Sequence, residues 1–138
     1  MDNAELEKIA LKALTRSYEV HQQLGISGEE PVKKNQFGDT ALRVDIEAEK
    51  AIIETCRENE IPIRIISEEH GITEIGKPMY LGVLDGLDGT SVYKKERGNG
   101  RYGTMFGIFS NLNPRYEDYI FNGVMEHSTE KLFYALKN

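Results

Sequence analysis

The sequence predicts an α+β domain, a layered arrangement in which two helices pack on a mainly antiparallel sheet. Three observations lead to this fold class. Two amphipathic segments come first, five short apolar runs typical of strands follow them, and a polar turn joins the last two runs. Helices followed by strands favour a layered domain over alternating βαβ units. The chain has 138 residues, so we expect a single domain, 1–138, with a core of its own.

The first helix is expected at residues 4–24, where apolar side chains recur at near-helical spacing. Asp2 and Glu5 resemble a capping box at its start, and Gly25 supplies a stop at its end. The residues that follow, 27–38, contain glycines and a proline, and we expect them to form an irregular loop.

The second helix is expected to start near Asp45 and to end before Pro62, because proline cannot continue a helix. Its spacing places Ala48, Ile52 and Cys56 on one face. Cys56 is the only cysteine, which excludes an internal disulfide and a cysteine-based zinc site. We therefore expect its side chain to be buried as a small apolar group.

Five short runs rich in apolar and β-branched residues are predicted to be strands. They span residues 63–66, 80–84, 104–109, 119–125 and 131–136. A polar turn at 126–129 joins the last two runs and predicts an antiparallel hairpin. We expect this hairpin to expose an apolar face or a strand edge, which favours self-association.

Composition and charge narrow the classes of function. The net charge of −6 disfavours non-specific nucleic-acid binding, which depends on clustered Lys and Arg. No apolar run reaches the length of a membrane span, and the acidic N-terminus is unlike a signal peptide. We therefore expect a cytoplasmic protein without nucleic-acid or membrane partners. His21, His70 and His127 show no metal-ligand spacing, and we expect all three on the surface.

Paired acids stand at the ends of two predicted strands. Glu68 and Glu69 follow the first strand, and Asp85 and Asp88 follow the second. Carboxylates brought together repel one another, and hard cations such as Mg²⁺ relieve that repulsion. A tight turn would aim Asp85 and Asp88 at one point, with the carbonyl of Leu87 as a further ligand. An isolated Asp-Gly-Leu-Asp-Gly segment is equally typical of a surface turn, so that alternative stays open.

The residues that follow these acids suit a phosphate group. Gly89, Thr90 and Ser91 offer backbone N–H groups without bulky side chains, and the Thr90 hydroxyl can orient a water. Metals, a phosphate-binding backbone and a polarising carboxylate are the parts that metal-assisted phosphate hydrolysis needs.

Residues 84–91 resemble the Asp-Pro-Ile/Leu-Asp-Gly-Thr/Ser signature of the lithium-sensitive, Mg²⁺-dependent phosphatases, the superfamily of inositol monophosphatase and fructose-1,6-bisphosphatase. Residues 67–69, Ser-Glu-Glu, lie upstream where that family has its Gly-Glu-Glu element. Asp39 and Asp45 resemble an earlier Asp-containing element of the family, which Glu49 continues. One departure lies inside the signature, where Gly86 replaces the usual proline and loosens the turn.

The resemblance implies a role for each matching residue. The implied Mg²⁺ ligands are Glu68, Asp85, the Leu87 carbonyl and Asp88, with Glu69 touching a second metal. The implied catalytic residues are Glu68, Thr90 and Asp45, and the implied phosphate-binding residues are Gly89, Thr90 and Ser91. Mn²⁺ is the expected substitute for Mg²⁺, and Lys34 lies where the family often has a lysine near the site.

Asp45 and Lys34 each have a second interpretation. A carboxylate in the first turn of a helix is favoured by the helix dipole, so Asp45 is equally expected there without a metal role. Lys34 is also explained as a solvated cation of its loop.

The resemblance implies the N-terminal half of the sugar-phosphatase fold and Mg²⁺-dependent hydrolysis of an inositol or sugar phosphate monoester by a metal-activated water. Family members continue into a C-terminal substrate domain that supplies another metal-binding Asp, and nothing in these 138 residues matches it. The chain is therefore expected to be a truncated piece, a split half that needs a partner, or a domain without catalysis.

The expected partners follow from these interpretations. They are a small phosphorylated substrate and either a second copy of the chain or a complementary C-terminal domain. The alternative function is a non-catalytic module that binds a metal or a phosphate.

Overall fold

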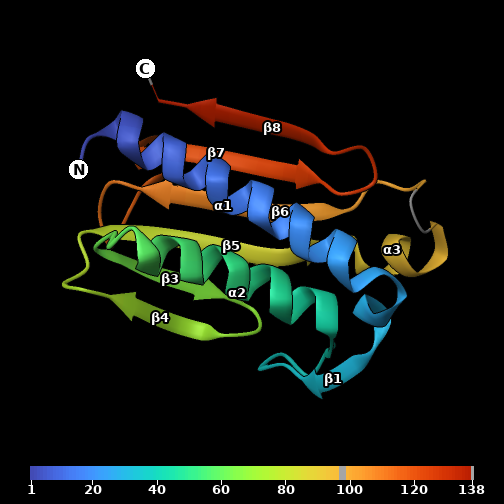
Figure 1. The fold of residues 1–138 in the computed structure, drawn as a ribbon. Coiled ribbons are helices and arrows are strands. Elements are labelled where there is room, and N and C mark those ends of the chain that lie inside the picture. The colour runs from blue at the N-terminus through green and yellow to red at the C-terminus, as the bar shows by residue number, and fades with distance from the viewer. Residues whose placement is uncertain (97–98, 138) are drawn as a thin grey trace.

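The structure, a computed structural model, describes residues 1–96 and 99–137. Its main layers are a pair of helices and a large sheet, and Figure 1 shows both helices lying across the same face of that sheet. The helices are α1 (Asn3–Leu24) and α2 (Arg43–Glu58), and they contact each other. The two-layer arrangement of helices on a sheet is therefore the one that the sequence predicted.

The large sheet has the strand order β4-β3-β5-β6-β7-β8. Its strands are β3 (Ile63–Ser67), β4 (Gly71–Ile75), β5 (Tyr80–Asp88), β6 (Gly103–Phe109), β7 (Tyr119–Glu126) and β8 (Lys131–Leu136). Strands β3 and β5 run parallel, and the other neighbouring pairs are antiparallel. The sheet is thus mainly antiparallel, with α1 packed on β6 and β7 and α2 packed on β3 and β5.

The smaller elements between α1 and α2 and after β5 lie at one end of these layers (Figure 1). β1 (Pro31–Lys34) pairs with β2 (Thr40–Leu42) in a separate ribbon, and α3 (Thr90–Glu96) follows closely after β5. Short 3₁₀ turns are found at Gly25–Glu29 and Tyr116–Asp118. In the described parts of the chain, no helix is long and apolar enough to cross a membrane.

Both predicted helices are confirmed, together with their local signals. The Glu5 N–H donates to the Asp2 side chain at 2.8 Å, and the Asp2 N–H donates to the Glu5 side chain at 3.0 Å, which completes the capping box. Gly25 ends α1 with a φ of 51°, a value that favours glycine. The predicted apolar face of α2 is buried, and Cys56 lies within it.

Several local predictions were wrong or incomplete. The loop expected at 27–38 contains strand β1, and strand β4 and helix α3 were not predicted. β4 alternates half-buried and exposed side chains over most of its length, so it lacks the apolar run that marks a central strand. β5 continues to Asp88 instead of ending at residue 84, so Asp85 and Asp88 belong to the strand itself.

The main core lies between the two helices and the large sheet. Its largest fully buried members include Leu6, Leu14, Ile52, Ile63, Ile65, Ile108, Phe106 and Phe121. Burying one such side chain stabilises the fold by about 1.5–3 kcal/mol relative to its exposure. A second cluster joins β2, α2, β5 and α3, and it consists of Leu42, Val44, Leu87, Tyr93 and Tyr102. This second cluster ties the acidic end of β5 to the start of α2.

The opposite face of the large sheet carries exposed apolar side chains. Ile66, Ile72, Val83, Met105 and Phe133 are between 41% and 67% exposed. The strand registers place them on one face, because register partners and residues two apart along a strand share a face. We name these five residues the open face. Phe133 belongs to the predicted hairpin, whose expected apolar exposure is thereby confirmed.

Helix α2 and strand β5 approach each other closely at Gly86. A β-carbon at this residue would collide with the backbone carbonyl oxygen of Asp45 and would lie 2.8 Å from Cγ of Glu49. The close packing of α2 therefore requires glycine at position 86. The β-carbon of a proline, the residue of the resembled signature, would meet the same collision in this structure.

We expect Gly86→Ala to lower the melting temperature, because the backbone of α2 would have to move away from β5. Overpacking a core in this way costs roughly 1–3 kcal/mol. Where no collision occurs and φ is negative, the same change stabilises a protein by about 0.4–1 kcal/mol through the unfolded chain. Thermal unfolding followed by circular dichroism measures the difference, and an unchanged or raised melting temperature would contradict the packing described here.

Candidate metal centre

The parallel pairing of β3 and β5 brings the predicted acids together. Ser67 at the end of β3 is the register partner of Leu84 on β5. The next residue along each strand is an acid, Glu68 after β3 and Asp85 within β5. Parallel neighbours carry their following residues to the same edge of a sheet, so the two carboxylates share that edge.

A hollow of about 490 Å³ opens at this edge, and we name it the acidic cleft. Its lining residues are Asn35, Asp39, Thr40, Asp45, Glu68, Glu69, Asp85, Leu87, Asp88, Gly89, Thr90, Ser91 and Lys94. All predicted site residues except Lys34 are therefore gathered around one cleft. Sequence reasoning assigned no role to Asn35 or Thr40, which lack a distinctive motif.

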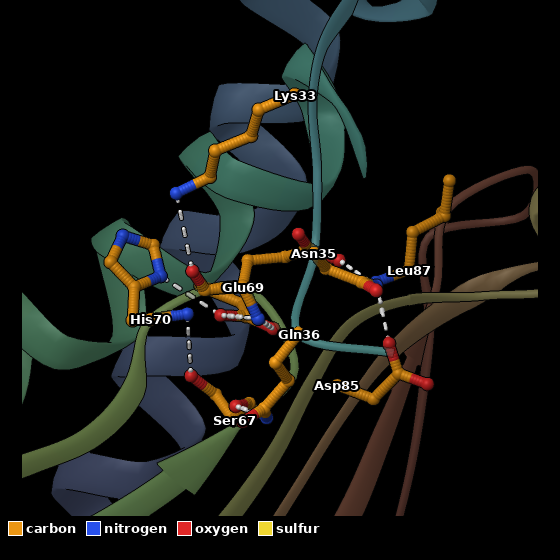
Figure 2. Close-up of polar contacts among 9 residues, drawn as sticks. Lys33, Asn35, Gln36, Ser67, Glu69, His70, Asp85 and Leu87 are labelled. Carbon is orange, nitrogen blue, oxygen red and sulfur yellow. Dashed lines mark hydrogen bonds and ion pairs between the residues drawn. The ribbon is translucent and has the colours of Figure 1, made fainter. Parts of the chain in front are cut away.

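Lys34 is exposed and does not line the cleft, whereas its neighbour Lys33 does face the acids. The Lys33 ammonium group donates to the backbone carbonyl of Glu69 at 3.5 Å, as Figure 2 shows. Both lysines lie on β1, where successive side chains point to opposite sides. Their alternation on the strand explains why one lysine contacts the acidic segment and the other does not.

The signature segment folds as a turn with internal hydrogen bonds. Asp85 Oδ1 accepts from the backbone N–H of Leu87 at 3.1 Å (Figure 2). The Thr90 hydroxyl donates to the Leu87 carbonyl at 3.3 Å. Gly89 has a φ of +87°, which glycine adopts without the steric cost of a β-carbon. These contacts hold the two predicted oxygen donors, Asp85 and Leu87, in one short segment.

Asp45 lies in the first turn of α2. Its position is compatible with both earlier interpretations, a carboxylate at a helix start and a residue of the metal site. Its Oδ2 accepts from the Leu42 N–H at 2.9 Å, as expected of a carboxylate at a helix start. The same side chain lines the acidic cleft and is 5% exposed. The helix-start contact thus leaves the carboxylate within the cleft.

A buried carboxylate, Glu49, supports the cleft from behind. It is 0% exposed, and its oxygens accept from the backbone N–H of Glu69 at 3.2 and 3.3 Å. His70 Nδ1 lies 2.8 Å from Glu49 Oε2. The available sequence signal was an acid four residues after Asp45, on the side of α2 that carries Ala48 and Ile52. Glu49 anchors the Glu68–Glu69 turn to α2.

The expectation that all three histidines lie on the surface was wrong. His127 is 2% exposed, and its ring stacks on that of His21 with centroids 4.7 Å apart. His21 also contacts the edges of Tyr93 and Tyr102. Burial comes from partners far away in the sequence, which residue spacing does not reveal.

The carboxyl groups of the cleft are difficult to ionise together. Burial is the largest cause of a raised pKa in Asp45, Glu68, Glu69 and Asp85, and neighbouring negative charges add to it. The pKa of Asp45 rises to about 7, although its hydrogen bond from Leu42 acts in the opposite direction. Groups that repel in this way favour a proton or a cation among them.

The donor set of the cleft fits a hard divalent cation such as Mg²⁺, which prefers carboxylate and carbonyl oxygens. Glu69 Oε1 accepts from the Asn35 side chain at 3.2 Å, but Glu69 Oε2 is buried without a hydrogen-bond partner among the described residues. A bare buried carboxylate oxygen is costly, and a cation satisfies it. Within residues 1–96 and 99–137, no three His, Cys, Asp or Glu side chains form a ready metal cluster. Mutual repulsion keeps such carboxylates apart.

The fold is that of the N-terminal half of the inositol monophosphatase and fructose-1,6-bisphosphatase structures. Helices on one face of a mainly antiparallel sheet make up this fold in the described part of the chain. The sequence matches no family model and no curated protein.

Individual solved structures make the likeness specific. The extragenic suppressor protein suhB from Bartonella henselae matches with a TM-score of 0.75 and 14% identity, over 96% of this chain and 48% of that one. An IMPase/NADP phosphatase complexed with Mg²⁺ and phosphate matches with a TM-score of 0.75 and 18% identity, over 99% and 49%. Leishmania major fructose-1,6-bisphosphatase matches with a TM-score of 0.72 and 16% identity, over 93% and 47%. This chain thus spans about half the length of the structures it matches.

The raised pKa of Asp45 predicts a pH-dependent effect of Asp45→Asn on stability. The folded state holds the Asp45 proton up to about pH 7, whereas the reference value is 3.8. The proton stabilises the fold below pH 3.8, and this stabilisation is lost as the pH rises through 7. Each pKa unit corresponds to about 1.4 kcal/mol. We therefore expect the free energy of unfolding of Asp45→Asn to exceed that of the parent by about a few kcal/mol at pH 8.

The gap in unfolding free energy between Asp45→Asn and the parent should shrink as the pH falls from 8 to 4. Denaturant unfolding with a chelator in the buffer measures it at each pH. Asparagine keeps an oxygen that accepts from Leu42, so loss of that contact does not obscure the result. A gap that stays constant with pH would show that the Asp45 carboxyl group is not perturbed.

Proposed function

We propose that this chain forms the metal- and phosphate-binding half of a Mg²⁺-dependent phosphomonoesterase that acts on an inositol or sugar phosphate. One observation carries the proposal. Five carboxylates from three separate segments, Asp45, Glu68, Glu69, Asp85 and Asp88, line the same cleft as residues 89–91. A solved structure with the same fold is an IMPase/NADP phosphatase complexed with Mg²⁺ and phosphate, which supports this chemistry.

In this proposal different acids of the cleft bind different cations. Glu68, Asp85, Asp88 and the Leu87 carbonyl hold Mg²⁺, and Glu69 contacts a second ion through its bare buried oxygen. When bound, Mg²⁺ polarises the phosphate and lowers the pKa of a coordinated water. Asp45 orients a further water or ion from the first turn of α2.

The remaining cleft residues bind and orient the reactants. Gly89, Thr90 and Ser91 receive the phosphate oxygens through their backbone N–H groups. The Thr90 hydroxyl, together with Glu68, orients the attacking water. Lys94 lies on the rim of the same cleft and supplies a positive charge for an anionic substrate.

A second candidate function is that of a binding module whose site is completed by another protein unit. The observation that favours it is the open face, which adjoins the acidic cleft. A hollow of about 620 Å³ is lined by apolar residues of this face, such as Val83 and Met105, and also by Glu68 and Asp85. A protein that covers the open face therefore reaches the acids. We propose that this unit is either a complementary C-terminal domain or a second copy of the chain.

The metal part of the proposal predicts that Mg²⁺ or Mn²⁺ raises the melting temperature. A ligand that binds only the folded state stabilises it by about 2.7 kcal/mol at one hundred times its dissociation constant. Asp85→Asn should lose most of this gain. Glu19→Gln, a matched change of an exposed acid on α1, should keep it. Calorimetry measures the rise in melting temperature for each protein. If the metal raises the melting temperature of Asp85→Asn as much as that of the parent, Asp85 is not part of the site.

The catalytic part predicts weak or undetectable release of phosphate from inositol or fructose phosphates by this chain alone. The metal-binding Asp and the substrate-positioning residues of the resembled family's second domain have no counterpart in these 138 residues. Losing one fixed group that stabilises the transition state costs roughly 10²–10³ in rate. A phosphate-release assay with Mg²⁺ on the parent, Asp88→Asn and Thr90→Ala measures this.

The two variants separate the ways in which this prediction can fail. Robust turnover that neither Asp88→Asn nor Thr90→Ala reduces would refute the proposed site. Robust turnover that both variants abolish would refute only the requirement for a second unit. Turnover that depends on an added second polypeptide supports completion of the site in trans.

A further inference from the structure

A buried chain of hydrogen bonds runs from His127, the residue after β7, to the acidic turn on β5. The Thr104 hydroxyl on β6 donates to the backbone carbonyl of Gly86 at 2.8 Å. Nε2 of His127 lies 2.7 Å from the same hydroxyl oxygen. Thr104 is 0% exposed and His127 is 2% exposed, so water does not compete for these contacts. Gly86 stands between Asp85 and Leu87, two of the proposed metal ligands.

The chain of hydrogen bonds has one direction. A carbonyl only accepts, so the single hydroxyl proton of Thr104 goes to Gly86. The hydroxyl oxygen is therefore the acceptor for His127, whose Nε2 must carry the proton. Burial, helped by the neighbouring His21, lowers the pKa of His127 to about 3, so the ring is neutral near pH 7. Its Nδ1, the unprotonated nitrogen, has no hydrogen-bond partner among the described residues.

The backbone ladder between β5 and β6 is interrupted where Thr104 acts. Asp85 pairs with Met105 and Asp88 pairs with Gly103, so two residues of β5 stand opposite Thr104 alone. Such a bulge leaves backbone groups without ladder partners and redirects the strand. At this interruption the Thr104 hydroxyl donates a hydrogen bond to the Gly86 carbonyl.

Gly86 is the residue that this contact holds. The close approach of α2 excludes any side chain at this position, and glycine leaves the backbone more freedom than other residues do. The proline of the resembled signature would restrict that freedom through its ring. In this chain a side chain of the neighbouring strand, that of Thr104, bonds the Gly86 carbonyl.

We propose that Thr104 and His127 are positioning residues that fix the Gly86 carbonyl and so set the direction in which Asp85 and Leu87 present their oxygens to a metal ion. The metal part of this inference rests on the proposed function. Neither residue touches the substrate or the metal, because both lie inside the fold behind the turn.

Two pairs of variants test the proposal. Thr104→Val and His127→Leu each remove one hydrogen-bonding group, whereas Thr104→Ser keeps the hydroxyl and His127→Gln keeps an N–H donor. Removing a residue that orients metal ligands typically weakens metal affinity by about 10–100-fold. We therefore expect Thr104→Val and His127→Leu to raise the Mn²⁺ dissociation constant by about tenfold or more, and the conservative variants to remain close to the parent. Titration with Mn²⁺ followed by electron paramagnetic resonance measures the constants.

A control separates positioning from simple loss of stability. Ile108→Val shortens a buried side chain of β6 away from the turn, so it should lower the melting temperature without changing the Mn²⁺ dissociation constant. If Thr104→Val binds Mn²⁺ as tightly as the parent does, the proposal is overturned, whatever its melting temperature.

Amide hydrogen exchange tests the turn without any metal. The Leu87 N–H is protected by Asp85 Oδ1, so its exchange rate reports opening of the turn. Thr104→Val should accelerate this exchange more than exchange in the core of β6, and Thr104→Ser should not. If the parent does not bind Mn²⁺, the proposed function is refuted. The exchange rates alone then test whether Thr104 positions the turn. Unchanged exchange at Leu87 in Thr104→Val overturns it.

Discussion

The close approach of α2 to β5 is the constraint on which the acidic cleft depends. At Gly86 the backbone carbonyl of Asp45 occupies the space that a β-carbon needs, so helix and strand meet backbone to backbone. Burial raises the pKa of Asp85, and this contact holds Glu49 of α2 close enough to add to the rise. The contact also holds Asp45 of α2 close enough to Asp85 for the Asp85 charge to add to the raised pKa of Asp45. A larger residue at position 86 would push the first turn of α2 outward and separate these acids. The electrostatic character of the cleft is therefore a consequence of packing at one glycine.

Helix α2 also holds the Glu68–Glu69 segment in place through Glu49. The backbone at Gly86 is held in turn by a hydrogen bond from Thr104. Glu49 is fully buried, and it accepts from the Glu69 N–H and contacts His70, so the end of β3 is anchored to α2 as firmly as β5 is. A buried carboxylate without such donors would be strongly destabilising, which makes this arrangement specific. At Gly86 the ladder with β6 is interrupted, and the Thr104 hydroxyl holds the free carbonyl.

The parts of the structure that were predictable have local signals. The two long helices follow from apolar periodicity and caps, and the shared edge of Glu68 and Asp85 follows from acids placed at strand ends. Strand β1 and helix α3 expose most of their side chains, and β4 alternates half-buried and exposed ones, so no apolar run marks these elements. The burial of His127 depends on Thr104, 23 residues away, and on His21, and neither contact leaves a trace in residue spacing. Lys34 was assigned by position alone, and strand alternation turned Lys33 to the acids instead.

Two buried groups on either side of the acidic turn respond to pH in opposite ways. Asp45, with its pKa raised from 3.8 to about 7, binds a proton more tightly in the folded state, so its contribution to stability grows as the pH falls from 7 towards 3.8. His127 has its pKa lowered from 6.5 to about 3, so it stays neutral in the folded state at pH values where the unfolded chain binds a proton. Its contribution to stability is therefore lost as the pH falls from 6.5 towards 3. The two slopes oppose each other between pH 3.8 and 6.5. A flat stability profile in this range therefore does not mean that the interior lacks perturbed groups. It is what an acid that resists ionisation and a histidine that resists protonation produce together.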